Sequence, residues 1–130
     1  ENSMSNLTRI KMKKLIEWVE IPTADFSRAV NFYNKVFMLS LQEIDCGSEK
    51  MACFPTGEGA IFYKPDYKPS TNGVIVSFCV PDSIEKTATR IEQNGGKIVF
   101  PKTKIEVEGR GYFALFLDSE GNKIGLYESL

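Results

Sequence analysis

Glu20 is the side chain of this sequence best suited to acid–base chemistry. It lies two positions after Trp18 in the apolar segment "KLIEWVEIP" (residues 14–22), which has the composition of a β-strand. Residues two apart in a strand point to the same side, so Trp18 and Glu20 are predicted to share a face. A carboxylate beside apolar surface can move a proton or contact a substrate. Alternatively, Glu20 lies at the mouth of a cleft and pairs with a lysine or arginine.

The chain contains no histidine, which excludes the Ser-His and Cys-His pairs that activate most nucleophiles. Ser77 and Cys79, in the apolar segment "VIVSFCV" (residues 74–80), are therefore predicted to pack rather than to attack a substrate. The three cysteines are Cys46, Cys53 and Cys79, without C-x-x-C spacing. An odd number without metal-binding spacing favours free thiols and hence a cytoplasmic location.

Composition limits the classes of partner. The 130 residues are enough for one domain, and 16 basic against 17 acidic residues give a net charge of -1. This balance gives no reason to expect binding to nucleic acid or to a membrane surface. No apolar segment reaches the roughly 20 residues that span a bilayer. We therefore expect a small-molecule ligand.

Hydrophobic periodicity predicts a β-α-β-β-β order that occurs twice. In the first copy Asp25 is the predicted N-cap of a helix whose apolar stripe extends to Phe37. In the second copy Asp82 is the predicted N-cap, Glu85 completes a capping box, and "NGG" (residues 94–96) ends the helix. The predicted strands are residues 14–22, 41–46, 51–54, 60–64, 74–80, 97–100, 112–117 and 123–128.

Alignment of Asp25 with Asp82 defines an internal repeat. It divides residues 14–130, a single domain, into module one (14–64), a linker (65–73) and module two (74–130). Residues 1–13 are predicted to be an N-terminal extension. Its first residues, "ENS" before Met4, are typical of a tag remnant. The predicted fold is α+β: two βαβββ modules form an eight-stranded, open, barrel-like mixed sheet with the helices outside and a cleft inside.

The sequence also resembles a known family. The resemblance lies in the repeat and in three motifs: "WVEIPTADFSRAVNFY" (residues 18–33), the second helix ending in "NGG", and "GRGYFALFLDSEGNKIGLYE" (residues 109–128). Together these are similar to the vicinal oxygen chelate superfamily, and most similar to its glyoxalase/bleomycin resistance branch. The resemblance implies the fold just described and leaves a homodimer open.

In metal-using members, as the resemblance implies, four ligands come from the first and fourth strands of each module. These ligand positions fall on Trp18, Ile61, Ile75 and Gly125. None of the four side chains has an imidazole, carboxylate or thiolate donor for a divalent metal ion. We therefore predict that the metal site is lost and that no cofactor is bound.

The predicted cleft is apolar and aromatic with few polar groups, as is usual for a small-molecule site. Its predicted lining residues are Trp18, Glu20, Ile61, Tyr63, Ile75, Ser77, Gly125 and Tyr127. The leading hypothesis is a metal-free protein that binds a small organic molecule. The alternative is a metal-independent lyase or isomerase in which Glu20 is the catalytic base and a tyrosine hydroxyl stabilises an oxyanion. A third hypothesis is a structural or regulatory protein whose own side chains fill the cleft.

Met38 follows the first predicted helix where family members often have glycine. Glycine there ends a helix in the left-handed conformation. The sequence therefore predicts either a different helix end or a methionine in that conformation.

Overall fold

The computed structural model describes residues 14–130, and the predicted extension at residues 1–13 lies outside the described part. The described chain forms two four-stranded sheets, in the orders β1-β4-β3-β2 and β5-β8-β7-β6. In chain order the elements are β1 (Val19–Pro22), α2 (Phe26–Phe37), β2 (Glu43–Asp45), β3 (Lys50–Cys53), β4 (Gly59–Tyr63), β5 (Ser77–Cys79), α3 (Ile84–Gln93), β6 (Lys97–Lys104), β7 (Tyr112–Leu117) and β8 (Lys123–Glu128).

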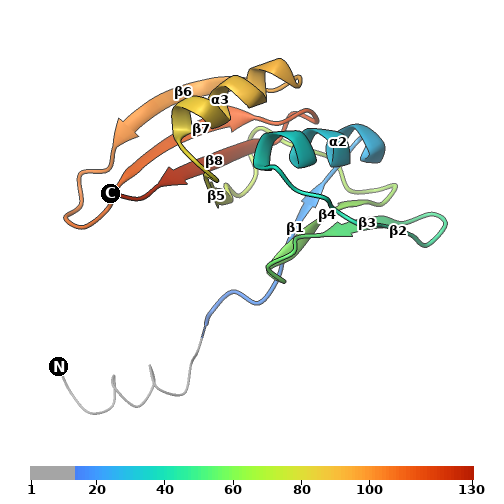
Figure 1. Cartoon of the computed structure of the whole chain (residues 1–130). Coiled ribbons are helices and arrows are strands. Elements are labelled where there is room, and N and C mark those ends of the chain that lie inside the picture. Colours follow the sequence, from blue (N-terminus) through green and yellow to red (C-terminus); the bar gives the residue numbers. More distant parts are fainter. Residues whose placement is uncertain (1–13) are drawn as a thin grey trace, which may run out of the picture.

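Each sheet is mixed, because its first strand runs parallel to its fourth while the remaining pairs are antiparallel. β1 and β5 are edge strands, and the two sheets share no strand pairing. Both helices lie on one side of the sheets (Figure 1). The prediction of an α+β fold with two βαβββ modules and an open sheet is confirmed. No helix within residues 14–130 has the length and hydrophobicity required to cross a bilayer.

Helix α2 begins where the sequence predicts. The Asp25 carboxylate accepts a hydrogen bond of 3.1 Å from the Arg28 backbone N–H, as an N-cap does. The apolar stripe of α2 is buried from Phe26 to Phe37. The helix ends at Met38, whose backbone adopts the left-handed conformation with φ 57° and ψ 51°. Met38 therefore takes the conformation that glycine usually supplies.

Helix α3 begins one residue later than predicted. Its N-cap is Ser83, whose hydroxyl accepts from the Lys86 N–H, so the predictions of an Asp82 cap and a Glu85 capping box are wrong. Asp82 instead accepts two hydrogen bonds of 3.0 Å from the Arg90 guanidinium. These bonds from Arg90, with one from the Ser83 N–H, hold the pKa of Asp82 well below its usual range. The predicted stop is confirmed, since α3 ends at Asn94 and Gly95 has φ 95°.

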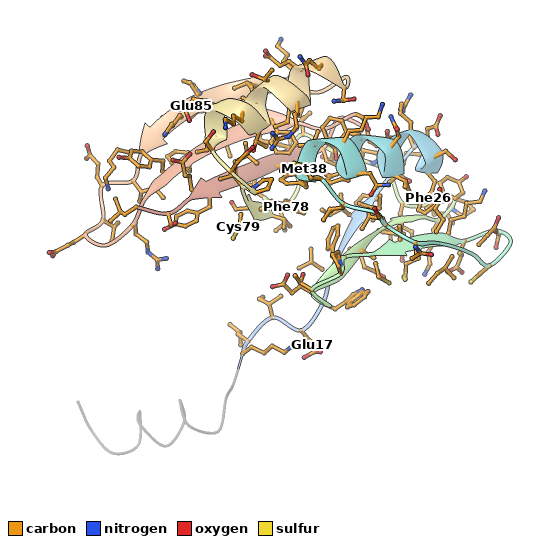
Figure 2. All side chains as sticks on the ribbon, in the orientation of Figure 1. Glu17, Phe26, Met38, Phe78, Cys79 and Glu85 are labelled. Carbon is orange, nitrogen blue, oxygen red and sulfur yellow. The ribbon has the colours of Figure 1, made fainter. Side chains whose placement is uncertain are left out.

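Aromatic rings of α2 join the two modules into one core. Phe37 stacks on Phe78 of β5 with ring centroids 4.8 Å apart, and Tyr33 lies 5.7 Å from the same ring. Phe32 packs against Phe116 of β7 at 6.2 Å. Figure 2 shows Phe78 close to the end of α2, on the other module. Because α2 packs on both sheets, it acts as the shared layer between them.

The turn between β7 and β8 anchors the start of α2. Glu120 accepts hydrogen bonds from the backbone N–H groups of Ala24 (3.0 Å) and Asp25 (2.7 Å), and from Arg28 Nε (2.8 Å). The side chain of Glu120 is only 1% exposed. Asp118, also buried, accepts from the Tyr33 hydroxyl at 2.7 Å. A turn of module two thus satisfies donors of module one.

We expect Glu120→Gln to lower the free energy of unfolding by about 2 kcal/mol near neutral pH, because a buried acceptor of several hydrogen bonds loses its charge. Burial alone would raise the pKa of Glu120, but hydrogen bonds from Arg28 and Asp25 outweigh it and lower the pKa. A lowered pKa stabilises the fold above the ordinary glutamate value of 4.5, and this stabilisation is lost as pH falls below it. The difference between variant and wild type should therefore shrink in acid. Urea unfolding from about pH 7 to pH 4 measures it.

The matched control is Glu92→Gln, which removes the same charge from an exposed position on α3. It should change stability by less than about 0.5 kcal/mol. Equal effects of the two substitutions would contradict the anchoring role of Glu120.

We expect Met38→Gly to raise the free energy of unfolding by about 1 kcal/mol, because a left-handed residue with a Cβ is strained. Met38 is 59% exposed, so little buried apolar surface is lost. The control is Lys35→Gly, within the helix, which should lower stability by about 1 kcal/mol. Thermal unfolding measures both, and a destabilised Met38→Gly variant would show that its side chain has a packing role.

Candidate functional site

The register of the second sheet brings three predicted site residues together. Ser77 lies opposite Gly125, and Cys79 lies opposite Tyr127. Ser77, Gly125 and Tyr127 therefore share one face, the side of the sheet away from α3. Ile75 precedes β5 and is 46% exposed. The hydroxyl of Tyr127 accepts a hydrogen bond of 3.2 Å from the Gly111 N–H.

Gly125 is buried beneath Ser77. A Cβ atom at position 125 would overlap the Ser77 hydroxyl oxygen and lie 3.2 Å from the Ser77 Cβ atom. The serine side chain thus occupies the space that any side chain at 125 would enter. The glutamate ligand that the resemblance implies at this position has no room unless Ser77 moves.

The first sheet confirms the shared face of Trp18 and Glu20, since Trp18 Nε1 donates to Glu20 Oε2 at 3.2 Å. Both residues are exposed. Within residues 14–130 no lysine or arginine lies within ion-pair distance of Glu20, so the pairing considered for it is not formed there. Glu20 lines two small hollows, of about 240 and 130 Å³.

Ile61 does not face the predicted cleft, and its placement there is wrong. It lies opposite Ile21 and is fully buried in the core beneath α2, whereas Ala60 lies opposite Glu20. A shift of one residue along a strand moves a side chain to the other face. Six residues separate the paired Cys53 and Ala60 of β3 and β4, whereas five separate the paired Leu117 and Lys123 of β7 and β8, and this difference hid the shift. Tyr63, two residues after Ile61 on the same strand, shares the face of Ile61 and packs against the core, so the prediction that it faces the cleft is also wrong. It borders the smaller hollow at the end of β4.

The donor chemistry does not fit the metal that the resemblance implies. Trp18, Ile75 and Gly125 have no ligand atoms suited to a divalent ion, nor has Ile61 or Ala60. Among residues 14–130 there is also no group of three or more histidine, cysteine, aspartate or glutamate side chains that could hold a metal ion.

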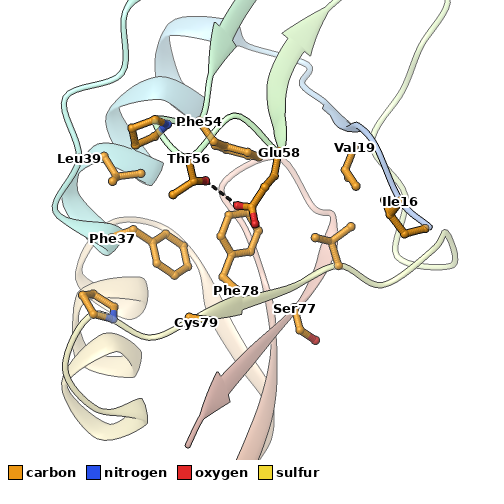
Figure 3. A pocket seen from close by; sticks show the side chains of 13 residues that line it. Ile16, Val19, Phe37, Leu39, Phe54, Thr56, Glu58, Ser77, Phe78 and Cys79 are labelled. Carbon is orange, nitrogen blue, oxygen red and sulfur yellow. Dashed lines mark hydrogen bonds between the residues drawn. The ribbon is translucent and has the colours of Figure 1, made fainter. Parts of the chain in front are cut away.

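A cavity larger than the hollows beside Glu20 lies elsewhere, in the seam between the two modules (Figure 3). We call it the seam cavity; its volume is about 540 Å³. It is bounded by the start of β1, the end of α2, the turn between β3 and β4, and strand β5. Its lining residues are Ile16, Val19, Phe37, Leu39, Phe54, Pro55, Thr56, Glu58, Val76, Ser77, Phe78, Cys79 and Pro81.

The polar groups of the seam cavity gather in the turn between β3 and β4. There the Thr56 hydroxyl donates to Glu58 Oε1 at 2.5 Å. The Glu58 side chain extends toward the Phe78 ring, whereas the Ser77 hydroxyl points away from the cavity (Figure 3). The seam cavity is thus an apolar hollow with one carboxylate, and can hold an apolar molecule that has a polar end.

Of the predicted site residues only Ser77 lines the seam cavity. The other lining residues of the seam cavity were not predicted as site residues. The cavity forms where the two modules meet, and a repeat alignment describes each module separately. The one sequence signal for it was the turn "PTGEG" (residues 55–59), whose Glu58 and Thr56 are polar residues between two apolar strands.

Comparison with known proteins agrees with this fold. Residues 15–126 match the family model described as the glyoxalase/bleomycin resistance protein/dioxygenase superfamily. A search of curated protein sequences found no match.

Similar solved structures belong to the same group. A glyoxalase/bleomycin resistance protein/dioxygenase family enzyme from Burkholderia phytofirmans PsJN is 19% identical with a TM-score of 0.67, covering 90% of this chain and 100% of its own. The fosfomycin resistance protein FosX from Listeria monocytogenes, complexed with Mn(II) and sulfate, is 18% identical with a TM-score of 0.65, covering 92% of each chain. Glyoxalase I from Zea mays is 20% identical with a TM-score of 0.65; 86% of this chain matches only 45% of that protein.

We expect Gly125→Ala to lower the free energy of unfolding by about 1 kcal/mol, because the Ser77 hydroxyl must rotate away and the added Cβ still lies 3.2 Å from the Ser77 Cβ atom. Ser77→Ala alone should have a small effect, since Ser77 is exposed. In the double variant, removal of the hydroxyl should recover part of the loss. A double-mutant cycle by urea unfolding measures this coupling, and strict additivity would show that Ser77 does not fill the space above Gly125.

Proposed function

Since the chain belongs to the glyoxalase/bleomycin resistance protein/dioxygenase superfamily, we propose that it binds a small, largely apolar organic molecule without a metal ion, in the seam cavity. The single observation behind the proposal is the cavity itself. Its volume of about 540 Å³ lies within the range of about 300 to 1,000 Å³ usual for small-molecule sites.

The lining of the seam cavity supports an apolar guest. Phe37, Phe54 and Phe78 contribute three aromatic rings, and Val19, Leu39 and Val76 contribute aliphatic side chains. Transfer of an apolar surface from water to such a lining is favourable by about 25 cal/mol per Å². The hollows beside Glu20, on the face of the predicted cleft, are less than half as large as the seam cavity.

The metal-free part of the proposal follows from donor chemistry. FosX from Listeria monocytogenes was solved with Mn(II), whereas the ligand positions carried over to this chain are held by Trp18, Ile75, Gly125 and either Ile61 or Ala60. Hard divalent ions require oxygen or nitrogen donors, which these side chains lack.

Glu20 as the base of a metal-independent lyase or isomerase is the second candidate function. One observation favours it: the carboxylate lines two hollows beside the first sheet. The hydrogen bond from Trp18 Nε1 would orient the carboxylate. We rank this candidate second because those hollows are small and Glu20 is exposed to solvent.

We expect the neutral dye N-phenylnaphthylamine, which fluoresces in apolar surroundings, to bind the purified protein. Val76→Trp should weaken this binding by about tenfold or more, because the larger side chain enters the seam cavity. The matched control is Val74→Trp, two residues earlier at a position that is 91% exposed and outside the cavity lining. Fluorescence titration with direct excitation of the dye measures both affinities.

If the dye does not bind the wild type, or if the two variants lose affinity equally, the seam cavity is not the binding site. A parallel titration of Glu20→Gln separates the candidates. Unchanged dye binding in this variant is expected for the seam cavity, whereas lost binding would favour the hollows beside Glu20.

A further inference from the structure

From the charge and geometry of the seam cavity we infer that it selects ligands with an apolar body and one positive charge. The inference rests on the proposed function, since it names the class of molecule that the same cavity takes. It depends on Glu58, a residue that the sequence did not single out, and on the rings around it.

Glu58 is the one charged side chain in the cavity lining within residues 14–130. Of the other polar lining residues, Thr56 and Ser77 are uncharged hydroxyls and Cys79 is a free thiol. No lysine or arginine lines the cavity, and none lies within ion-pair distance of Glu58 in this part of the chain. Glu58 therefore gives a negative electrostatic potential in the part of the cavity next to it, and apolar walls weaken this potential less than water would.

The Glu58 carboxylate is also oriented to accept a hydrogen bond from a ligand. Thr56 donates to Glu58 Oε1, and this bond fixes the orientation of the group. The second oxygen, Oε2, accepts no hydrogen bond from any residue in the range 14–130, and the side chain extends toward Phe78 (Figure 3). An ammonium group at this point would form a charge-assisted hydrogen bond, which is stronger than a bond between neutral groups.

The aromatic lining favours the same charge. Phe78 lies between Phe37, stacked at 4.8 Å, and Phe54, which meets it edge-on at 5.4 Å. The faces of aromatic rings attract cations through their quadrupole. An alkyl or aryl ammonium ion could thus place its apolar part on these rings and its charge beside Glu58.

Anionic ligands should bind the seam cavity least well. A carboxylate or phosphate in the seam cavity would meet Glu58 without a neutralising cation from the lining. A neutral molecule would keep the contacts with the rings but would gain no ion pair. Affinity should therefore fall from cation to neutral molecule to anion.

The test uses three probes of matched shape: phenylbutylamine, phenylbutanol and phenylbutyrate. Each competes with N-phenylnaphthylamine for the wild-type protein at low ionic strength, where exposed charges are least screened. The amine should displace the dye at a concentration about fivefold lower than the alcohol, as expected for an ion pair open to solvent, and the carboxylate should be weakest.

Three variants separate the charge of Glu58 from other effects. In Glu58→Gln the amine should lose its advantage while displacement by the alcohol stays unchanged. In Thr56→Val the advantage should persist, because the carboxylate remains. In Glu92→Gln, which removes the same charge from exposed α3, all three probes should behave as in the wild type.

The outcomes distinguish the two proposals. If the dye does not bind, or none of the probes displaces it, the proposed function fails. If the dye binds and the three probes displace it equally, or if the amine keeps its advantage in Glu58→Gln, the function stands and the charge preference is overturned.

Discussion

The packing of α2 against the second sheet is the contact on which the rest of the structure depends. The two sheets share no strand pairing within residues 14–130, so no backbone ladder holds β1 to β5. Side chains must do so: Phe37 and Tyr33 on Phe78, Phe32 on Phe116, and Glu120 at the first turn of α2. Because no strand pairing joins the two sheets in the described part of the chain, a seam runs between them. Side-chain packing determines where this seam is filled and where it stays open.

The two ends of α2 differ in how the seam is closed. At the start of the helix, Glu120 satisfies backbone donors, and Asn122 Nδ2 donates to the Pro22 carbonyl at 2.8 Å. Polar groups there are directional, and the hollow that Pro22 and Asn122 line is about 240 Å³, less than half the volume of the seam cavity. At the far end, near Phe37 and Leu39, the contacts are mainly apolar and the seam cavity remains open. Apolar contacts have no required geometry, which permits a hollow where hydrogen bonds would have closed the gap.

Features that depend on residues close in sequence could be predicted, whereas features that depend on distant residues could not. The order of elements and the Asp25 cap depend on near neighbours, and both were predicted. At residue 38 the sequence left two alternatives open, and the structure has the left-handed methionine. The N-cap of α3 was not, because Asp82 is held by Arg90, whose Nε also donates to the Val36 carbonyl of α2 at 2.8 Å. The face of Ile61 depends on a register between strands, and the repeat could not supply it across turns of unequal length. The seam cavity depends on how two modules meet, which no pattern within a single module contains.

Glu58 explains why the charge of a ligand should matter in a cavity that is otherwise apolar. With the cavity open, this carboxylate is exposed and solvated, so the fold bears no cost for it. A bound molecule that fills the space beside Phe78 removes part of that water. The lost hydration must then be replaced, since a carboxylate taken from water without a partner is strongly unfavourable. Thr56 supplies one hydrogen bond, to Oε1. For a ligand that covers Oε2, a cationic group replaces the lost hydration better than a neutral donor does.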